Sequence, residues 1–226
     1  VNLGFNFGII NKYDLCARID CDFIVTKDYL KSMESIFNND SEIVAASPKI
    51  KHAYLRNTIW WCGFKSTWSY LKFQRTMNLK KKRIMDNENY KGLIETDAIA
   101  GCCSFYKPDA LNITGLEDED FIFGPEDAEL SFRLKKVGKL MVNLDTTTFH
   151  KIASSIKVSG WRYRSFNETK GFLLLIKKTG SSADKIIGYL YHLLRIPYFF
   201  ILLLLKKRNK DKVIGFSKGC LDFFLN

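Results

Sequence analysis

Apolar and polar positions alternate in short blocks along the first half of the chain. Residues 15–19 form a short apolar run that predicts a strand, and 26–37 repeat apolar positions at helical spacing. Residues 43–46 predict a second strand, which Ser47 and Pro48 should end. Gly and Asn punctuate 1–11, so we expect a loop entering a helix there. Strands alternating with helices favour an α/β domain.

The same alternation continues further along the chain. Residues 98–106 are apolar and small, which is typical of a buried strand. A helix is predicted over 128–137, with Gly138 ending it. Two further extended segments are predicted over 139–143 and 146–150.

Beyond Trp161 the pattern changes to one long apolar segment. Residues 186–205 are strongly apolar but contain Arg195 and Pro197, and a Lys-Lys-Arg run follows at 206–208. The length is about the minimum for a membrane span, although an arginine near the middle makes spanning costly. Aromatic and basic side chains favour a helix lying on an anionic membrane surface. A true span, and a helix packed on its own domain or a partner subunit, remain alternatives.

Charge is distributed unevenly along the chain. Residues 1–150 hold 20 Lys and Arg against 20 Asp and Glu, whereas residues 151–226 hold 15 against 4. The basic excess therefore borders the apolar segment, and we expect no nucleic-acid partner despite the basic run at 80–83. The surrounding stretch 54–90 supports no assignment of regular structure. The six cysteines show no CxxC pair, so reduced thiols are expected rather than disulfides or zinc.

Two acidic pairs carry candidate chemistry. Asp20 and Asp22 end the first predicted strand, where residues i and i+2 point the same way, so both carboxylates could face one pocket. Such oxygens suit Mg²⁺ or Mn²⁺, and a solvated acidic turn is the alternative. Glu126 and Asp127 come just before a predicted helix, whose amino-terminal end stabilises negative charge. Their alternative to a chemical role is therefore to cap that helix. His150 gains significance only together with these acids.

Taken in order, five segments resemble the family-2 glycosyltransferases with the GT-A fold. The resemblance is to rhamnosyltransferase-like members of bacterial surface-glycan pathways, lipopolysaccharide among them, and it covers roughly residues 1–167. The matching segments are 2–11, Arg18-Ile-Asp-Cys-Asp22, 100–106, 115–133 and Phe149-His150. The resemblance implies an α/β GT-A domain, a mixed sheet flanked by helices, over 1–167. A basic, amphipathic, membrane-associating helical tail should follow over 168–226.

The resemblance also implies roles for individual residues. Asp22 and His150 would ligate the Mg²⁺ or Mn²⁺ ion, and Asp20 would contact the nucleotide-sugar donor. Asp127 would be the general base, and Glu126 would hold the acceptor. Further donor contacts are implied for Asn2 and Gly101. Arg133 is expected to be a structural ion-pair partner.

The function so implied is inverting transfer of a hexosyl or deoxyhexosyl group to a glycan or lipid-linked glycan acceptor. Residues 186–208 would hold the enzyme at the cytoplasmic face of the cell membrane. A non-catalytic scaffold subunit of a glycan-assembly complex is the alternative, and a processive synthase is disfavoured because no Gln-x-x-Arg-Trp pattern follows Trp161. The chain departs from the family in two ways. The family has strands that bind the nucleotide base before the Asn2 segment, so we expect this chain to be a fragment that binds the donor poorly. Arg18 also stands where the family has an apolar residue.

Overall fold

The computed structural model describes residues 1–55, 57–64, 84–122, 124–151, 156–206 and 209–225. The chain divides into two compact units, each described by itself. The first comprises residues 1–66, 75–117 and 127–152, and the second comprises 67–74, 118–126 and 153–226. The basic run at 80–83 lies outside the described residues.

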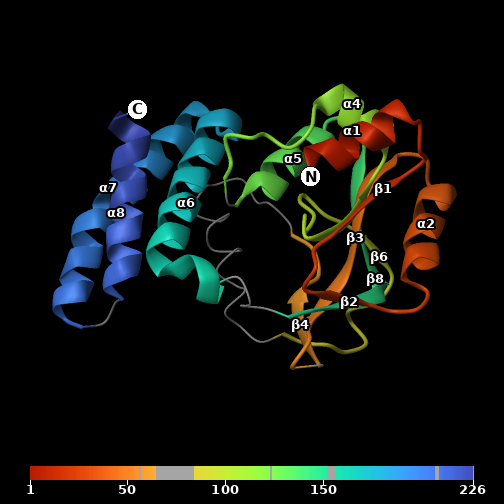
Figure 1. The fold of residues 1–226 in the computed structure, drawn as a ribbon, viewed down its shortest axis with the longest axis horizontal. Helices are drawn as coiled ribbons and strands as arrows, with labels where there is room; N and C mark the ends of the chain where they lie inside the picture. The colour runs from red at the N-terminus through yellow and green to blue at the C-terminus, as the bar shows by residue number, and fades with distance from the viewer. Residues whose placement is uncertain (56, 65–83, 123, 152–155, 207–208, 226) are drawn as a thin grey trace. The chain divides into compact units, whose positions relative to one another are not determined.

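Within the described residues of the first unit, eight strands form one mixed sheet (Figure 1). The strands are β1 (Cys16–Ile19), β2 (Phe23–Val25), β3 (Ile43–His52), β4 (Thr58–Trp61), β5 (Ile84–Met85), β6 (Leu93–Glu95), β7 (Cys103–Tyr106) and β8 (Lys139–His150). Their order is β1-β7-β3-β4-β5, while β8 pairs with β2, β3 and β6. The β3–β8 pair is parallel, and β1 pairs antiparallel with β7.

Helices cover both faces of this sheet. The helices of the first unit are α1 (Asn2–Ile10), α2 (Tyr29–Asn39), α4 (Pro108–Thr114) and α5 (Glu126–Leu134). Because neighbouring strand residues point to opposite faces, Ala45 and Tyr106 pack in one cluster with residues of α1, α4 and α5. Ala46 and Phe105 pack with α2 in the other cluster. The mixed sheet flanked by helices therefore has the expected architecture.

Two predicted strand boundaries were wrong. Pro48 does not end the second strand, because β3 continues to His52. One edge of β3 pairs with β7 at Ala45 and Ala46 and with β4 from Ile50 onward. Pro48 lies in the gap between these two partner strands. Its missing N–H therefore breaks no hydrogen bond of the sheet on that edge. The segments predicted over 139–143 and 146–150 form one strand, β8, with a register shift opposite Pro48.

The amino-terminal segment and the loop at 98–102 also differ from expectation. Residues 2–10 form the helix α1 instead of a loop, and only Cys103–Tyr106 of the predicted 98–106 strand is extended. In α1, a Cβ on Gly8 would lie 2.1 Å from Cys16 Sγ. Gly8 therefore allows α1 to approach β1 closely, and it does not mark a turn.

Among the described residues of the second unit there are three helices: α6 (Ile156–Thr179), α7 (Ser182–Leu204) and α8 (Lys210–Leu225). Gly215 and Gly219 let α8 approach α6, because a Cβ on either would lie within 2.6 Å of a carbonyl oxygen of α6. The buried core of this unit contains Leu173, Ile176, Phe199, Val213, Phe216 and Cys220. The expected boundary between 167 and 168 lies inside α6.

Candidate functional site

The turn that follows β1 carries the first acidic pair. The Asp20 N–H donates to the Cys102 carbonyl at 2.9 Å, and the Phe23 N–H donates to the Asp20 carbonyl at 3.2 Å. These bonds place Asp20 and Asp22 in a tight turn between β1 and β2. The alternation of side chains along a strand therefore does not govern their directions, and the two carboxylates have different neighbours.

Asp22 lies against His150. The Oδ2 atom of Asp22 is 3.2 Å from His150 Nε2, and β2 pairs with β8 so that Phe23 stands opposite His150. The imidazole stacks on the Phe23 ring with centroids 4.5 Å apart, and the Trp60 ring meets its edge at 4.7 Å. His150 Nδ1 is buried and has no hydrogen-bond partner among the described residues. The aromatic contacts fix the ring so that Nε2 faces the carboxylate.

Asp127 lies in the first turn of α5. Its Oδ1 accepts a hydrogen bond from the Ala128 N–H at 2.8 Å, and its Oδ2 accepts one from the Gly101 N–H at 3.3 Å. A Cβ on Gly101 would lie 2.8 Å from Asp127 Cβ, so only glycine permits this approach. The loop before β7 thus orients the Asp127 carboxylate through its backbone.

Arg18 joins this group from β1. Its Nη1 lies 2.5 Å from Glu117 Oε1, and its Nε lies 3.4 Å from Asp20 Oδ1. Arg18 Nη1 also lies 3.2 Å from the place where a Cβ on Gly101 would stand. The side chains of Arg18 and Glu117 are only 17% and 11% exposed, so solvent and salt screen their ion pair less than a surface pair. Asn2 holds the backbone of Glu117 through two reciprocal hydrogen bonds of 2.9 and 3.1 Å.

Hydrogen bonds join Asp20 to Cys102 and Asp127 to Gly101, so the two acids lie at the same loop, and their charges affect nearby groups. Burial raises the pKa of the Cys102 thiol, and the negative charges of Asp127 and Asp20 raise it further. Burial likewise raises the pKa of the Glu117 carboxyl. The positive charge of Arg18 lowers this pKa, and the negative charge of Asp127 raises it. Asp20 and Asp127 both act on the half-buried thiol of Cys102, although more than a hundred residues separate them in the chain.

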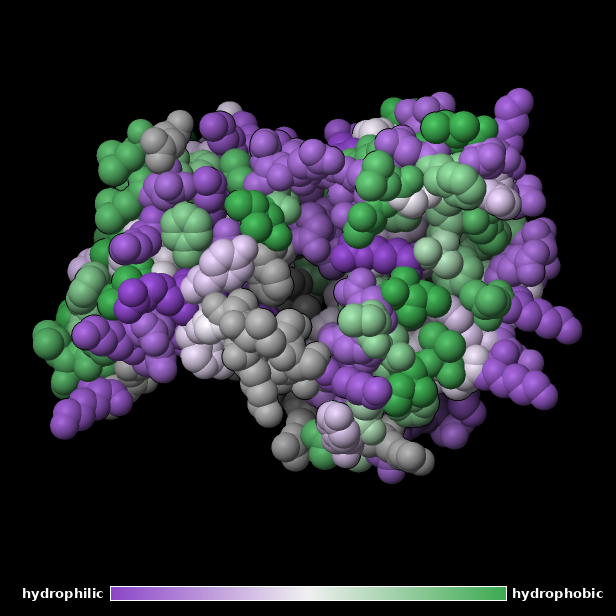
Figure 2. Space-filling model, viewed as in Figure 1, coloured by the Kyte–Doolittle hydropathy of each residue, from purple (hydrophilic) through white to green (hydrophobic). Residues whose placement is uncertain are grey.

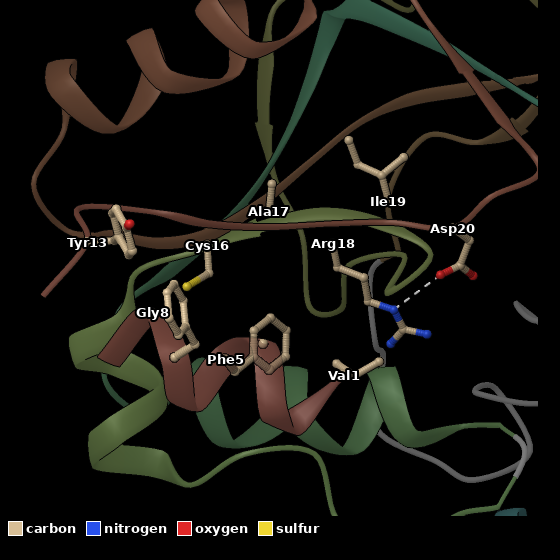
Figure 3. Close-up of a pocket in the computed structure, with 11 residues that line it drawn as sticks. Val1, Phe5, Gly8, Tyr13, Cys16, Ala17, Arg18, Ile19 and Asp20 are labelled. Carbon is tan, nitrogen blue, oxygen red and sulfur yellow. Dashed lines mark hydrogen bonds and ion pairs between the residues drawn. The ribbon is translucent and has the colours of Figure 1, made fainter. Parts of the chain in front are cut away.

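A groove of about 500 Å³ opens between α1 and β1 (Figure 3). Arg18 and Asp20 lie at one end of it, joined by their ion pair, while Phe5, Gly8 and Cys16 line the rest. Asp20 therefore lines a hollow with both charged and apolar walls. Such mixed walls are typical of sites that bind small ligands.

Most of the predicted site residues lie near this group. Asp20, Gly101 and Asp127 meet around Cys102, and Asp22 pairs with His150. Asn2 is committed to the backbone of Glu117, so its amide positions a loop. Glu126 begins α5 and belongs to the segment 118–126 of the second unit.

Arg133 has the structural role expected of it. Its guanidinium forms two-pronged hydrogen bonds with Glu129 at 2.6 to 3.0 Å and donates to the carbonyls of Thr114, Gly115 and Leu116. It therefore anchors the end of α4 to α5.

Asp22 and His150 form the candidate metal-binding pair. Among the described residues, no group of three or more His, Cys, Asp or Glu side chains could hold one. Asp22 nevertheless supplies a carboxylate of the kind that binds Mg²⁺ or Mn²⁺ together with water and substrate phosphates, and His150 would add a nitrogen ligand. The 3.2 Å between Oδ2 and Nε2 is close to the about 3 Å between neighbouring octahedral ligands at about 2.1 Å from the ion. The spacing of the two atoms is therefore compatible with two ligands of one divalent ion.

Sequence reasoning missed the parts played by Arg18 and Glu117. Arg18 was noticed only as a departure in an apolar strand, and Glu117 only as part of an acidic loop. A buried arginine requires a buried carboxylate partner, so the arginine itself was the signal. The identity of that partner depends on the tertiary fold.

Comparison with solved structures places the fold. The crystal structure of GalNAc-T7 with UDP, GalNAc and Mn²⁺ matches with a TM-score of 0.54 and 13% identity, over 96% of this chain and 40% of that chain. This chain has the GT-A fold. The crystal structure of A197 from STIV matches with a TM-score of 0.44 and 14% identity, over 67% of this chain and 65% of that chain.

The likeness to GalNAc-T7 extends to the fold alone, because so few residues are identical. This GT-A chain spans less than two thirds of either solved chain. No protein-family profile matches it, and no curated protein sequence matches it.

Proposed function

We propose that this GT-A protein is an inverting glycosyltransferase that moves a sugar from a nucleotide-sugar donor to a glycan or lipid-linked glycan acceptor. The observation that carries the proposal is that Asp20 and Asp127 are bound to adjacent residues of one loop, through the Asp20 N–H to the Cys102 carbonyl and the Gly101 N–H to the Asp127 carboxylate, with Asp20 lining a groove beside β1. The GT-A fold supports it, because GalNAc-T7 was crystallised with UDP, GalNAc and Mn²⁺.

In the proposed reaction, Asp127 acts as the general base. An acceptor hydroxyl passes its proton to a carboxylate oxygen of Asp127 while its own oxygen bonds to the anomeric carbon. The bond between that carbon and the diphosphate oxygen breaks, and its electron pair leaves with the nucleoside diphosphate. One such displacement inverts the anomeric configuration. A positioned base contributes ~10²–10⁴-fold to the rate, and the Gly101 N–H holds Asp127 in place.

Asp22 and His150 are the proposed holders of Mg²⁺ or Mn²⁺. When bound, the cation would stabilise the negative charge that develops on the leaving diphosphate. Asp20 is proposed to contact the donor, with Arg18 holding its carboxylate. We propose that Glu126 contacts the acceptor.

Asn2 and Gly101 are proposed to serve the donor site indirectly. Asn2 fixes the backbone of Glu117, which pairs with Arg18, and Gly101 fixes Asp127. The resemblance to family-2, rhamnosyltransferase-like proteins supports a hexosyl or deoxyhexosyl donor and a bacterial surface glycan as the product. A cytoplasmic location would follow, because nucleotide sugars are made there.

A screen of nucleotide sugars against the full-length protein with Mn²⁺ or Mg²⁺ tests the proposal. We expect one donor to release its nucleoside diphosphate in a metal-dependent reaction, and the product to have the opposite anomeric configuration by NMR. Asp22→Asn and His150→Gln should raise the metal concentration required for half-maximal rate. Retained configuration would contradict the mechanism. Absence of turnover with every donor would favour the scaffold subunit.

A further inference from the structure

The helix α7 exposes an apolar stripe along its whole length. Its exposed residues recur every three or four positions, which places them on one side of the helix. They are Ile186, Ile187, Leu190, Leu193, Leu194, Tyr198, Phe200, Ile201, Leu204 and Leu205. Figure 2 shows hydrophobic side chains along the edge where Figure 1 places α7. A stripe of this extent is uncommon on a surface that faces only water.

The opposite side of α7 packs within the second unit. Gly188, His192 and Phe199 are buried there. The guanidinium of Arg195 lies 4.6 to 5.0 Å from the ring centroids of Tyr191, Phe199 and Phe216, so three aromatic faces surround its charge. One side of α7 is therefore occupied by α6 and α8, and the stripe is the side that they leave uncovered.

This packing argues against a membrane span. Among the described residues, α7 is the only helix long and apolar enough to cross a bilayer. Its partners carry ion pairs between Arg162 and Asp211 and between Lys170 and Asp222, which hydrocarbon would not accommodate. Since α7 is packed against these helices, it cannot enter the bilayer core alone without losing its buried contacts.

The charges around the stripe indicate what covers it. No acidic residue occurs between Lys185, which is half-buried, and Lys206, which is exposed. Two further cations follow in the sequence at 207 and 208. A second copy of the chain would bring like charges together, whereas anionic lipid headgroups would complement them.

We propose that α7 lies flat in the interface of an anionic membrane, with the stripe toward the acyl chains. Lys185 and Lys206 then lie at the level of the headgroups, and Tyr198 is an interfacial aromatic. His192 and Arg195 stay on the protein side. This attachment does not depend on the proposed glycosyl transfer, because it uses only residues of the second unit.

Vesicle sedimentation with the 226-residue chain tests the stripe. The variant Leu190→Gln/Leu194→Gln/Ile201→Gln should bind vesicles containing phosphatidylglycerol at least tenfold more weakly, because each change removes apolar area from the bilayer contact. The matched control is Leu3→Gln/Phe7→Gln/Ile10→Gln, which alters an exposed apolar stripe on α1 and should bind as the parent does. Circular dichroism should show equal helix content in all three proteins.

A second pair of variants tests the charge. Lys185→Gln/Lys206→Gln should weaken binding to phosphatidylglycerol vesicles by about fivefold for each charge removed. The control Lys27→Gln/Lys31→Gln removes two exposed lysines of the first unit and should have no effect. Added salt should weaken the parent on the anionic vesicles, and binding to phosphatidylcholine alone should be weak.

Three results would overturn the proposal. The first is that the parent fails to sediment with anionic vesicles. The second is resistance to alkaline extraction, which would indicate a span. The third is a dimer, seen by light scattering, that the stripe variant dissociates while vesicle binding is unchanged.

Discussion

The two units of this protein place their charged and apolar side chains in opposite ways. In the first unit, carboxylates gather beside a groove, where backbone N–H groups and Arg18 orient them. In the second unit, the cation Arg195 lies among aromatic rings, while the apolar stripe of α7 faces outward. The first arrangement suits a small charged ligand, and the second suits an apolar surface. The contrast implies that binding and attachment can be altered separately.

The two described histidines near these features show the same contrast. His150 Nε2 faces the carboxylate of Asp22, so it is placed to share a ligand with an acid. His192 Nδ1 donates to the Gly188 carbonyl at 2.9 Å, and its ring stacks on Phe216. Burial, assisted by the charge of Arg195, lowers the pKa of His192 to about 4. Residue type alone could not have separated these roles.

The largest effect is expected from Asp127→Asn. The amide keeps the shape of the side chain but cannot take a proton from the acceptor, so turnover should fall by ~10²–10⁴-fold. Donor binding and vesicle binding should be unchanged, because Asp127 belongs to the first unit. The measurement is nucleoside diphosphate release together with vesicle sedimentation.

The matched control for that variant is Asp109→Asn, which changes an exposed acid in the first turn of α4. It should keep the parental rate. Equal turnover in Asp127→Asn and the parent would remove Asp127 from the catalytic role. Loss of vesicle binding in Asp127→Asn would show that the two units do not act separately.

A smaller effect is expected on the stability of the second unit, which should depend on pH through His192. The folded pKa of His192 is about 4, below its unfolded value of 6.5, so the unfolded chain binds more protons between these values. Stability of the second unit should therefore be intact above pH 6.5 and fall as the pH approaches 4, by about 3 kcal/mol at most. Hydrogen exchange of α7 and α8 amides measures this.

His192→Phe is the control for this titration. The phenyl ring can keep the stacking on Phe216 but cannot take up a proton. The pH dependence of exchange in α7 and α8 should therefore flatten. A variant with the parental pH dependence would assign the effect to another group.

Gly101→Ala should damage the first unit alone. A Cβ there would stand 2.8 Å from Asp127 Cβ, so the loop or α5 must move. The cost should be about 1–3 kcal/mol, as for other overpacked sites, and turnover should fall because Asp127 loses its hydrogen-bond donor. Thermal unfolding and turnover measure the two effects. Parental values of both would show that the Gly101 backbone does not position Asp127.

The sequence pattern predicted elements better than it predicted their ends. The β1 strand, the α2 helix and the apolar α7 helix follow from local periodicity. The sequence predicts that Pro48 ends a strand, because the gap between its partner strands is a tertiary feature that no local pattern shows. The glycines of residues 1–11 predict a loop at the start of this segment. Gly8 instead allows α1 to pack closely on Cys16, and this contact cannot be seen in the local sequence.

The candidate site depended still more on long-range structure. The acids could be named from a family resemblance, but their common neighbour Cys102 required the pairing of β1 with β7. Arg18 and Glu117 lie 99 residues apart, so no local pattern links them. The catalytic and metal roles of the acids stay predictions.

The smallest effect is expected within α1, where two glycines differ only in their surroundings. A Cβ on Gly4 would have no atom within 4 Å, whereas one on Gly8 would lie 2.1 Å from Cys16 Sγ. Gly4→Ala should therefore stabilise the first unit by about 0.5–1 kcal/mol, because alanine favours the helix. Gly8→Ala should destabilise it, because β1 must shift. Thermal unfolding measures both, and vesicle binding should be the same in each. If both variants lowered stability equally, close packing between α1 and β1 would not be the reason that glycine is required at position 8. The helix α1 could then not be treated as a rigid wall of the groove beside Arg18 and Asp20.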